Sequence, residues 1–172
     1  DAENALIFST GPFTGTPWPS AARYTVTAKS PATGAYGYAN SSGFFGPQMR
    51  KAGYDMFVIQ GISAEPVYLH VADYQISITP AKDLWGKTTG ETEDILRERH
   101  SGTKVASIGP AGENLVQIAS VINDYGRAAA RTGMGAVMGS KNLKAIAVKG
   151  SGKRDLPLEF KEVIKRVAPL VN

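Results

Sequence analysis

Short apolar runs separated by turn residues occupy most of the chain, and their periodicity predicts a protein built largely of strands. The runs at 5–9 and 55–60 each hold four consecutive apolar residues, which is typical of short buried strands. Residues 23–28 alternate β-branched with other side chains, which predicts a strand with one face on the core. The same criteria predict further strands at residues 35–39, 66–71, 75–79, 104–108, 115–122 and 145–148.

Helical spacing is rarer along the chain. The predicted helices are residues 44–52, 89–100 and 157–171, with a short helical turn at 80–85. Gly53 is expected just past the end of the first helix, and Thr89 and Thr92 are alternative N-caps of the second. Residues 109–114 are expected to form a tight turn. Because a helix does not follow nearly every strand, the pattern argues against a doubly wound fold and favours an α+β fold with mixed or antiparallel sheets.

Residues 123–144 form a glycine-rich run that also concentrates positive charge. Its cations are Arg127, Arg131, Lys141 and Lys144. Small residues that expose backbone N–H groups, beside arginine forks, suit an oxyanion such as phosphate. The same composition is typical of a glycine-rich loop on a basic surface, and the residues alone leave both interpretations open. No Walker loop occurs, and Met138 stands where a dinucleotide fingerprint starting at Gly133 needs its third glycine.

Carboxylates are missing from two long stretches of the chain. Residues 5–53 contain no Asp or Glu, and neither do residues 125–154. Each stretch carries a loop of small or polar residues, the first of them at 40–43. One polyanionic ligand between the two loops would explain both gaps, because a nearby carboxylate would repel it.

Composition limits the remaining function classes. The 172 residues are enough for one domain with an apolar core, and the net charge of +4 is only mildly basic. Without a basic block or an aromatic-rich RNA signature, no nucleic-acid partner is expected.

The absence of cysteine excludes a disulfide framework, an iron–sulfur cluster or a thiolate zinc site held by this chain alone. His70 and His100 lie far apart in sequence and match no metal-ligand spacing, so His70 is expected to be a half-exposed strand residue. No apolar run is long enough for a membrane span and no signal peptide opens the chain, so we expect a cytoplasmic protein without a membrane partner.

The two ends of the sequence indicate a piece of a longer polypeptide. The chain has no initiator Met and enters a strand-like segment almost at once. Residues 151–155 are linker-like, and the helix at 157–171 is expected to begin the next region of that polypeptide.

Ten motifs, in one order along residues 3–150, resemble the N-terminal domain of the aldehyde ferredoxin oxidoreductase family. They are Gly11-Pro12-x-Thr14-Gly15-Thr16, Arg23-Tyr24, Ser30-Pro31-x-Thr33-Gly34, Ala39-Asn40-Ser41-x-Gly43, Ala52-Gly53-Tyr54-Asp55, Pro66-Val67-Tyr68, Leu84-Trp85-Gly86-Lys87 with Glu91-Thr92, the run 108–114, Asn123-Asp124 and the run 135–146. The resemblance implies an α+β base of two packed β-sheets with a few peripheral helices, on which a tungsten (less often molybdenum) bis-pterin cofactor lies. Residues 1–150 would form this domain without its first strands, and residues 151–172 would be a linker and the start of the next helical region.

The resemblance also implies roles for particular residues. Arg23 and Arg127 match arginines that hold the pterin phosphates, and Asn40 and Ala128 match residues whose carbonyl oxygens bind the magnesium ion that bridges those phosphates. The neighbours expected to line the same cradle are Ser41, Gly43, Ala129 and Arg131. The chain departs from the family at Ala130 and Thr132, where glycines are usual, and we expect both residues to need a negative φ.

The resemblance implies an enzyme that oxidises aldehydes to carboxylic acids and passes electrons through a 4Fe-4S cluster to ferredoxin. The cluster cysteines and the catalytic residues would lie in other domains of the parent, so this chain has no catalytic residue and is expected to be inactive alone; a homodimer is left open. Two alternatives remain on the residues themselves. One is a stand-alone anion or nucleotide-phosphate-binding module, and the other is a domain kept only as a scaffold.

Overall fold

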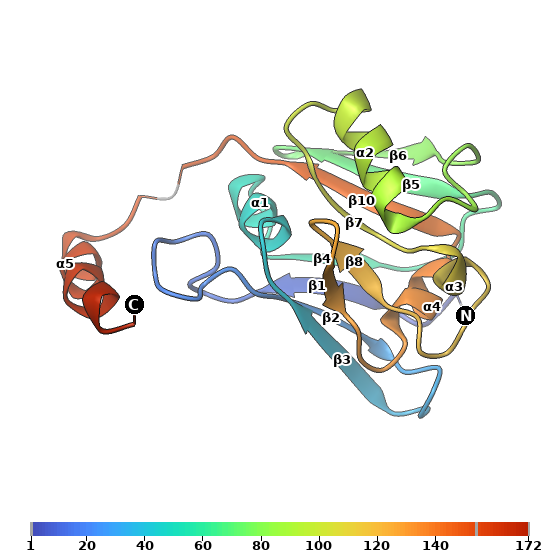
Figure 1. Cartoon of the computed structure of the whole chain (residues 1–172), viewed down its shortest axis with the longest axis horizontal. Coiled ribbons are helices and arrows are strands. Elements are labelled where there is room, and N and C mark those ends of the chain that lie inside the picture. Colours follow the sequence, from blue (N-terminus) through green and yellow to red (C-terminus); the bar gives the residue numbers. More distant parts are fainter. Residues whose placement is uncertain (1, 154, 172) are drawn as a thin grey trace.

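The computed structural model describes residues 2–153 and 155–171, which form two β-sheets packed face to face with short helices (Figure 1). The first sheet is antiparallel, with the order β3-β2-β1-β4. Its strands are β1 (Leu6–Thr10), β2 (Tyr24–Lys29), β3 (Tyr36–Ser41) and β4 (Met56–Ile59). The candidate functional site lies at one end of this four-stranded sheet.

The second sheet has six strands in the order β6-β5-β10-β7-β8-β9. Its strands are β5 (Val67–Ala72), β6 (Gln75–Pro80), β7 (Lys104–Ser107), β8 (Val121–Asn123), β9 (Arg127–Ala129) and β10 (Leu143–Lys149). β5 and β10 run parallel and the other neighbours antiparallel, so the sheet is mixed. The α+β prediction with two mixed or antiparallel sheets is confirmed.

The helices occupy three positions around these sheets. α1 (Phe45–Lys51) and α4 (Met134–Gly139) contact strands of both sheets and so close the space between them. α2 (Thr89–Arg99) packs on the outer face of the six-stranded sheet, and α3 (Pro110–Glu113) contacts α4. α5 (Leu158–Val167) and the 3₁₀ turn η1 (Ala168–Leu170) lie apart from the sheets at the end of an extended segment (Figure 1). Residue 154 of the expected linker lies outside the described residues.

The strand periodicity decides which side of the four-stranded sheet is buried. In β2 the residues Tyr24, Val26 and Ala28 are buried, and in β3 burial alternates strictly from residue to residue. The inward side chains join one core cluster with the six-stranded sheet, because an alternating strand buries only one face. No described helix covers the opposite face of β1, β2 and β3, which stays open (Figure 1).

The structure corrects several predicted boundaries. The predicted strand 115–122 is reduced to its last two residues, which begin β8 (Val121–Asn123). Residues 115–118 are exposed, and Leu115 has a φ of +58°, which ends any extended run. The expected turn at 109–114 contains α3, with Pro110 in its first turn. The N-cap of α2 is Thr88 and neither predicted threonine, because its Oγ1 accepts from the Glu91 N–H in a capping box.

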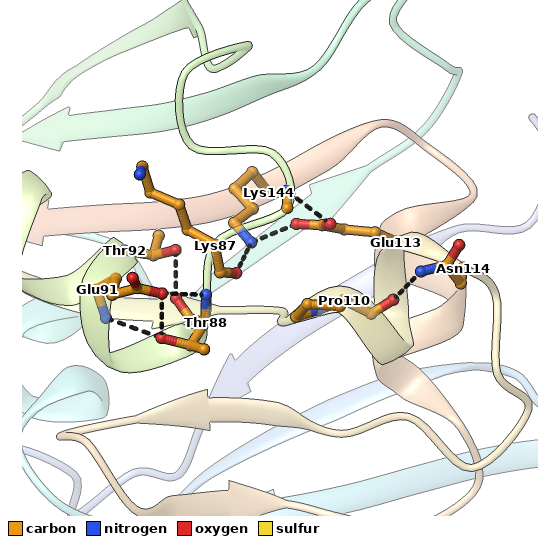
Figure 2. A network of polar contacts seen from close by, with 9 residues as sticks. Lys87, Thr88, Glu91, Thr92, Pro110, Glu113, Asn114 and Lys144 are labelled. Carbon is orange, nitrogen blue, oxygen red and sulfur yellow. Dashed lines mark hydrogen bonds and ion pairs between the residues drawn. The ribbon is translucent and has the colours of Figure 1, made fainter.

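A buried ion pair connects three segments on the far side of the core. Lys144 of β10, fully buried, pairs with the Glu113 carboxylate at the end of α3 and donates to the Lys87 carbonyl at 2.7 Å (Figure 2). The other Glu113 oxygen accepts from the Gly86 N–H at 2.8 Å. Burial lowers the pKa of Lys144, and Glu113 opposes that shift. The pair therefore fixes the loop that leads into α2 against β10 and α3.

Removing one partner of this pair is expected to destabilise the fold strongly. Lys144→Met leaves the Glu113 carboxylate buried without a counter-charge, and we expect a loss of about 3–5 kcal/mol in the free energy of unfolding. Lys144→Met combined with Glu113→Gln should lose less than the single variant, because no uncompensated charge is left. Urea denaturation measures both. Lys82→Met, at the exposed pair with Glu65, is the control and should cost less than about 1 kcal/mol. Equal losses in Lys144→Met and the control would contradict the role of the pair.

The two histidines, far apart in sequence, stack in the fold. The rings of His70 on β5 and His100 at the end of α2 have centroids 3.7 Å apart and an interplanar angle of 16°. The Tyr68 hydroxyl lies 2.9 Å from His100 Nε2. Burial lowers the pKa of both histidines, and the His70 ring and Arg99 lower that of His100 further. Stacked faces cannot both direct ring nitrogens at one metal ion, so the pair is a packing contact.

This stack is expected to make stability depend on pH. A histidine whose pKa is lower in the folded state binds fewer protons there than in the unfolded state. Stability should therefore be constant above pH ~6.5, the unfolded value, and fall as the pH decreases through the folded values. Denaturation midpoints between about pH 7.5 and 5.5 measure the slope. The double variant His70→Gln/His100→Gln should flatten it, and an unchanged slope would show that other groups cause it.

Candidate functional site

A hollow at the end of the four-stranded sheet gathers four of the residues singled out in the sequence. It has a volume of about 340 Å³. Its lining residues are Arg23, Tyr38, Asn40, Ala128, Ala130 and Arg131. β3 and β9 lie beside each other here, so the 40–43 and 127–131 segments, over eighty residues apart, meet, and Arg23 lines the same hollow. The prediction that they lie side by side is confirmed.

A second hollow of about 360 Å³ shares Arg23 and Asn40 with the first. Its other walls come from the loop between β1 and β2 and from Thr25. Thr14, buried in that loop, donates through Oγ1 to the Arg23 carbonyl at 2.9 Å and so fixes the backbone at the start of β2. The two neighbouring hollows, joined at Arg23 and Asn40, are together called the basic depression here.

The buried side-chain amide of Asn123 joins the two sheets behind this depression. Its Oδ1 accepts from the Tyr24 hydroxyl at 2.9 Å and from Ser41 Oγ at 2.7 Å. Its Nδ2 donates to the Ser42 carbonyl and to Asp124 Oδ2, both at 2.8 Å. All four hydrogen-bonding positions of the amide are occupied, and burial raises the pKa of Tyr24, which keeps its hydroxyl a donor. Asn123 therefore sets the position of β3 relative to β8.

Asp124 continues this junction from the turn between β8 and β9. Its Oδ2 also accepts from the Phe44 N–H at 2.7 Å, which ties the end of the 40–43 segment to the turn. Gly43 sits between them with a φ of +97°, and a Cβ on it would lie 2.2 Å from Asp124 Oδ2 and 2.6 Å from Arg127 Cδ. The close approach of the two segments thus needs a glycine at this position.

The remaining candidate residues stand behind or beside the hollows. Arg127 is exposed and donates to Ser42 Oγ at 3.0 Å, so it lies at the border of the depression. Ser41 and Ala129 are buried and face the core. Neither they nor Gly43 and Arg127 line the two hollows. Asn40 and Ser41 belong to β3 itself, whereas the sequence predicted a loop there, because the β2 pairing continues as far as Ser41.

The expectation that Thr132 needs a negative φ is wrong. Its φ is +59°, and Gly133 follows at +74°. Thr132 Oγ1 lies 3.3 Å from the Tyr38 carbonyl, to which it donates, so a contact with β3 compensates the unfavourable backbone region. This left-handed pair turns the chain out of the depression and into α4.

The lining is suited to binding and not to proton transfer. None of the residues that line the two hollows is Asp, Glu or His. In the part of the chain that the structure describes, no group of three or more His, Cys, Asp or Glu side chains could hold a metal ion. A cation here would need backbone carbonyl and ligand oxygens, a donor set typical of magnesium beside phosphates.

Sequence reasoning missed the residues whose hydrogen bonds hold the segments of the site in place. Tyr24, Ser42, Asn123 and Asp124 were not predicted as site residues, although Asn123-Asp124 stood out as a motif. An Asn-Asp pair before Tyr-Gly signals a turn, but nothing local shows that the amide would be buried against the other sheet.

A two-sheet α+β domain with a basic, carboxylate-free depression at the junction of its sheets is the class of protein that these features define. The chain belongs to the aldehyde ferredoxin oxidoreductase family, since the family model described as "Aldehyde ferredoxin oxidoreductase, N-terminal domain" matches residues 1–150. The resemblance in the sequence is thereby confirmed.

Two individual relatives are each about half identical to this chain. The chain is 51% identical over 162 residues to a "Tungsten-containing aldehyde ferredoxin oxidoreductase" of Pyrococcus furiosus, covering 93% of this chain and 26% of that protein. It is 52% identical over 151 residues to the protein of that name from Thermococcus kodakarensis, covering 87% and 25%. It therefore spans about a quarter of the length of these relatives.

A solved structure confirms the fold at the level of the backbone. The "Active site complex BamBC of Benzoyl Coenzyme A reductase in complex with 1,5 Dienoyl-CoA" superimposes with a TM-score of 0.94 and 36% sequence identity, over 98% of this chain and 26% of that one. The domain thus resembles part of a larger enzyme. Within residues 2–153 and 155–171, none of the helices combines the length and apolar character needed to cross a bilayer.

The fit at Gly43 can be tested against a matched glycine. Gly34 also has a positive φ, +70°, but a Cβ there meets nothing within 4 Å. Gly34→Ala should cost only the backbone strain, about 1–2 kcal/mol in the free energy of unfolding. Gly43→Ala adds a clash with Asp124 and Arg127 and should cost at least about 1 kcal/mol more, because overpacking forces the neighbours to move. Urea denaturation measures both, and equal losses would show that the two segments are not packed as described.

Proposed function

We propose that this chain binds the phosphate groups of a bis-pterin cofactor carrying tungsten, or less often molybdenum, and forms the base on which that cofactor lies in a longer oxidoreductase. The observation that carries this proposal is the hollow of about 340 Å³ that brings Arg23, Asn40, Ala128 and Arg131 together without a carboxylate in its lining. The names of the relatives supply the tungsten and the aldehyde chemistry.

The residues present fit such a group. Exposed guanidinium groups at 23, 127 and 131 surround the depression, and Arg forks match phosphate oxygens with paired hydrogen bonds. The small side chains Ala128 and Ala130 leave the backbone accessible, so carbonyl oxygens such as those of Asn40 and Ala128 could share a magnesium ion with the phosphates. Tyr38 and Asn40, which line the hollow, are exposed residues of β3, so the hollow lies on the outward face of the four-stranded sheet and ring systems would rest against that face.

In this proposal the cofactor, when bound, supplies the redox chemistry, and this chain binds and orients it. The arginines hold the phosphate end, and the stiff strands behind them keep that end in one place. Aldehyde oxidation, transfer of electrons through a 4Fe-4S cluster to ferredoxin, and the acid–base groups belong to other parts of the longer protein. The chain alone supplies none of the cysteines that a cluster needs.

Substrate choice is assigned to those other parts. The chain is also 34% identical, over 87% of its length, to an "Aliphatic sulfonate oxidoreductase, WOR-like subunit" of Pyrococcus furiosus. Relatives named for sulfonate, benzoyl-CoA and aldehyde chemistry thus share this domain. We propose the aldehyde activity because the identity near one half is to the aldehyde enzymes. A stand-alone phosphate-binding module is the alternative, and it predicts anion binding with no metal in the full-length protein.

Conservative replacement of the arginines tests the cradle. Arg23→Lys and Arg127→Lys keep the charge but lose the planar fork, so the tungsten and pterin contents of the full-length protein should each fall by about half or more. Elemental analysis and pterin fluorescence after oxidation measure the two contents. Arg166→Lys, an exposed residue on α5, is the control and should leave both unchanged. Unaltered tungsten and pterin in both site variants would refute the assignment.

A further inference from the structure

A buried carboxylate lies behind the turn that carries Asp124. Glu93 is on α2, is only 2% exposed, and accepts from the Tyr125 N–H through Oε2 at 2.9 Å. Its Oε1 has no hydrogen-bond partner among the described residues, and the nearest cation, Arg97 Nη1, lies 3.7 Å from it. Neither the core nor the phosphate cradle explains why a carboxylate is buried at this point.

The turn that Glu93 holds has an unusual backbone. Asp124 and Tyr125 have φ values of +45° and +62°, so two consecutive residues with side chains are left-handed. Such a pair persists only where surrounding contacts support it. α2 supplies them: beside the Glu93 contact, the Tyr125 hydroxyl donates to Asp94 Oδ1 at 2.6 Å and accepts from Arg97 Nη1 at 3.2 Å.

The same turn sets the border of the depression. Asp124 holds the Phe44 N–H and the Asn123 amide, and two residues after Tyr125 the chain reaches Arg127, which donates to Ser42. If the turn relaxed to ordinary negative φ values, the Asp124 carboxylate and the start of β9 would both move. β9 is the edge strand of its sheet, and Arg127 pairs there with Asn123 of β8, so its backbone position depends on the turn that joins the two strands.

We infer that Glu93 is a positioning residue for the anion cradle: its carboxylate holds the left-handed Asp124–Tyr125 turn and thereby places Arg127 beside Ser42. The inference rests on the proposed function only for the identity of the anion. The link from α2 to the turn is geometric and can be measured without any ligand.

Charge makes this support sensitive to pH. The groups that face Glu93 are Asp124 from the turn, Arg97 from its own helix and Lys104 from β7. Burial raises the pKa of Glu93 and Asp124 adds to the shift, while the Tyr125 N–H, Arg97 and Lys104 oppose it. Because the folded pKa is above the unfolded one, the folded state takes up the proton first as the pH falls. The ionised carboxylate is therefore the form that burial penalises, and the stability of the packed turn should rise as the pH falls through the folded pKa of Glu93.

The first experiment measures hydrogen exchange of the Tyr125 backbone amide by NMR in the whole chain, because this amide reports directly on the turn. Glu93→Leu keeps the volume but removes the acceptor, and exchange should become at least about tenfold faster. Glu93→Gln keeps a neutral acceptor, so the protection of the Tyr125 amide, taken as the intrinsic exchange rate divided by the observed one, should stay high and lose the pH dependence that Glu93 gives the native chain. Glu98→Gln removes an exposed carboxylate from the same helix and should behave like the native chain. If Glu93→Leu does not fold, the pH dependence in Glu93→Gln decides: a pH dependence like that of the native chain would overturn the inference.

The second experiment measures the affinity of the phosphate cradle by titrating the chain with inorganic pyrophosphate in the presence of magnesium. Glu93→Leu should bind about tenfold more weakly than the native chain, a loss of the size of one charge-assisted contact. Adding Tyr125→Gly should restore much of the affinity, because glycine adopts a positive φ without support. A variant that merely destabilised the core would show no such rescue.

The outcomes separate the inference from the function on which it rests. A native chain that binds no pyrophosphate, with fast Tyr125 exchange in Glu93→Leu, supports the positioning of the turn and refutes the phosphate cradle. Native binding that is unchanged in Glu93→Leu, or Tyr125 exchange that is equal in both chains, overturns the inference and leaves the cradle intact.

Discussion

The four hydrogen bonds of the Asn123 side chain are the constraint on which the site depends. A buried amide with every donor and acceptor occupied tolerates very little displacement, because each bond that is broken leaves a polar group without water. Two of its partners belong to the first sheet through Tyr24 and Ser41, and the amide itself belongs to the second. The relative position of the sheets is thus determined by polar contacts in addition to the shared apolar core, which by itself is non-directional.

The basic depression follows from that junction. Once β3 and β9 are held side by side, exposed arginines from segments with no carboxylate meet at one open edge of the sheet. Their mutual repulsion is tolerated because their charges face solvent, where the dielectric is high. The nearby carboxylates of Glu93 and Asp124 face inward and are occupied by backbone N–H groups, so they support the turn without neutralising the arginines.

A second buried carboxylate, that of Glu113, has a lysine as its partner. Lys144 and Glu113 are paired in the interior and their remaining hydrogen-bonding groups meet backbone atoms of the loop before α2. The loop before the N-terminus of α2 is thus fixed to β10 and α3 (Figure 2). The middle of α2 carries Glu93 and Asp94, which contact Tyr125 in the β8–β9 turn. α2 is thus in contact both with the buried ion pair's loop and with the turn beside the site.

The sequence by itself determined the fold class, most strands and the two carboxylate-free segments, because periodicity and composition are local properties of the chain. Tertiary structure decided what lies far apart in sequence: the Asn123 junction spans 99 residues to Tyr24, and the histidines meet only through α2 and β5. It also overrode local preferences at Thr132 and Tyr125, where contacts outweigh the intrinsic cost of the backbone conformation. Side chain hydrogen bonds between distant segments leave no periodic trace, which is why the supporting residues of the site became visible only in the folded chain.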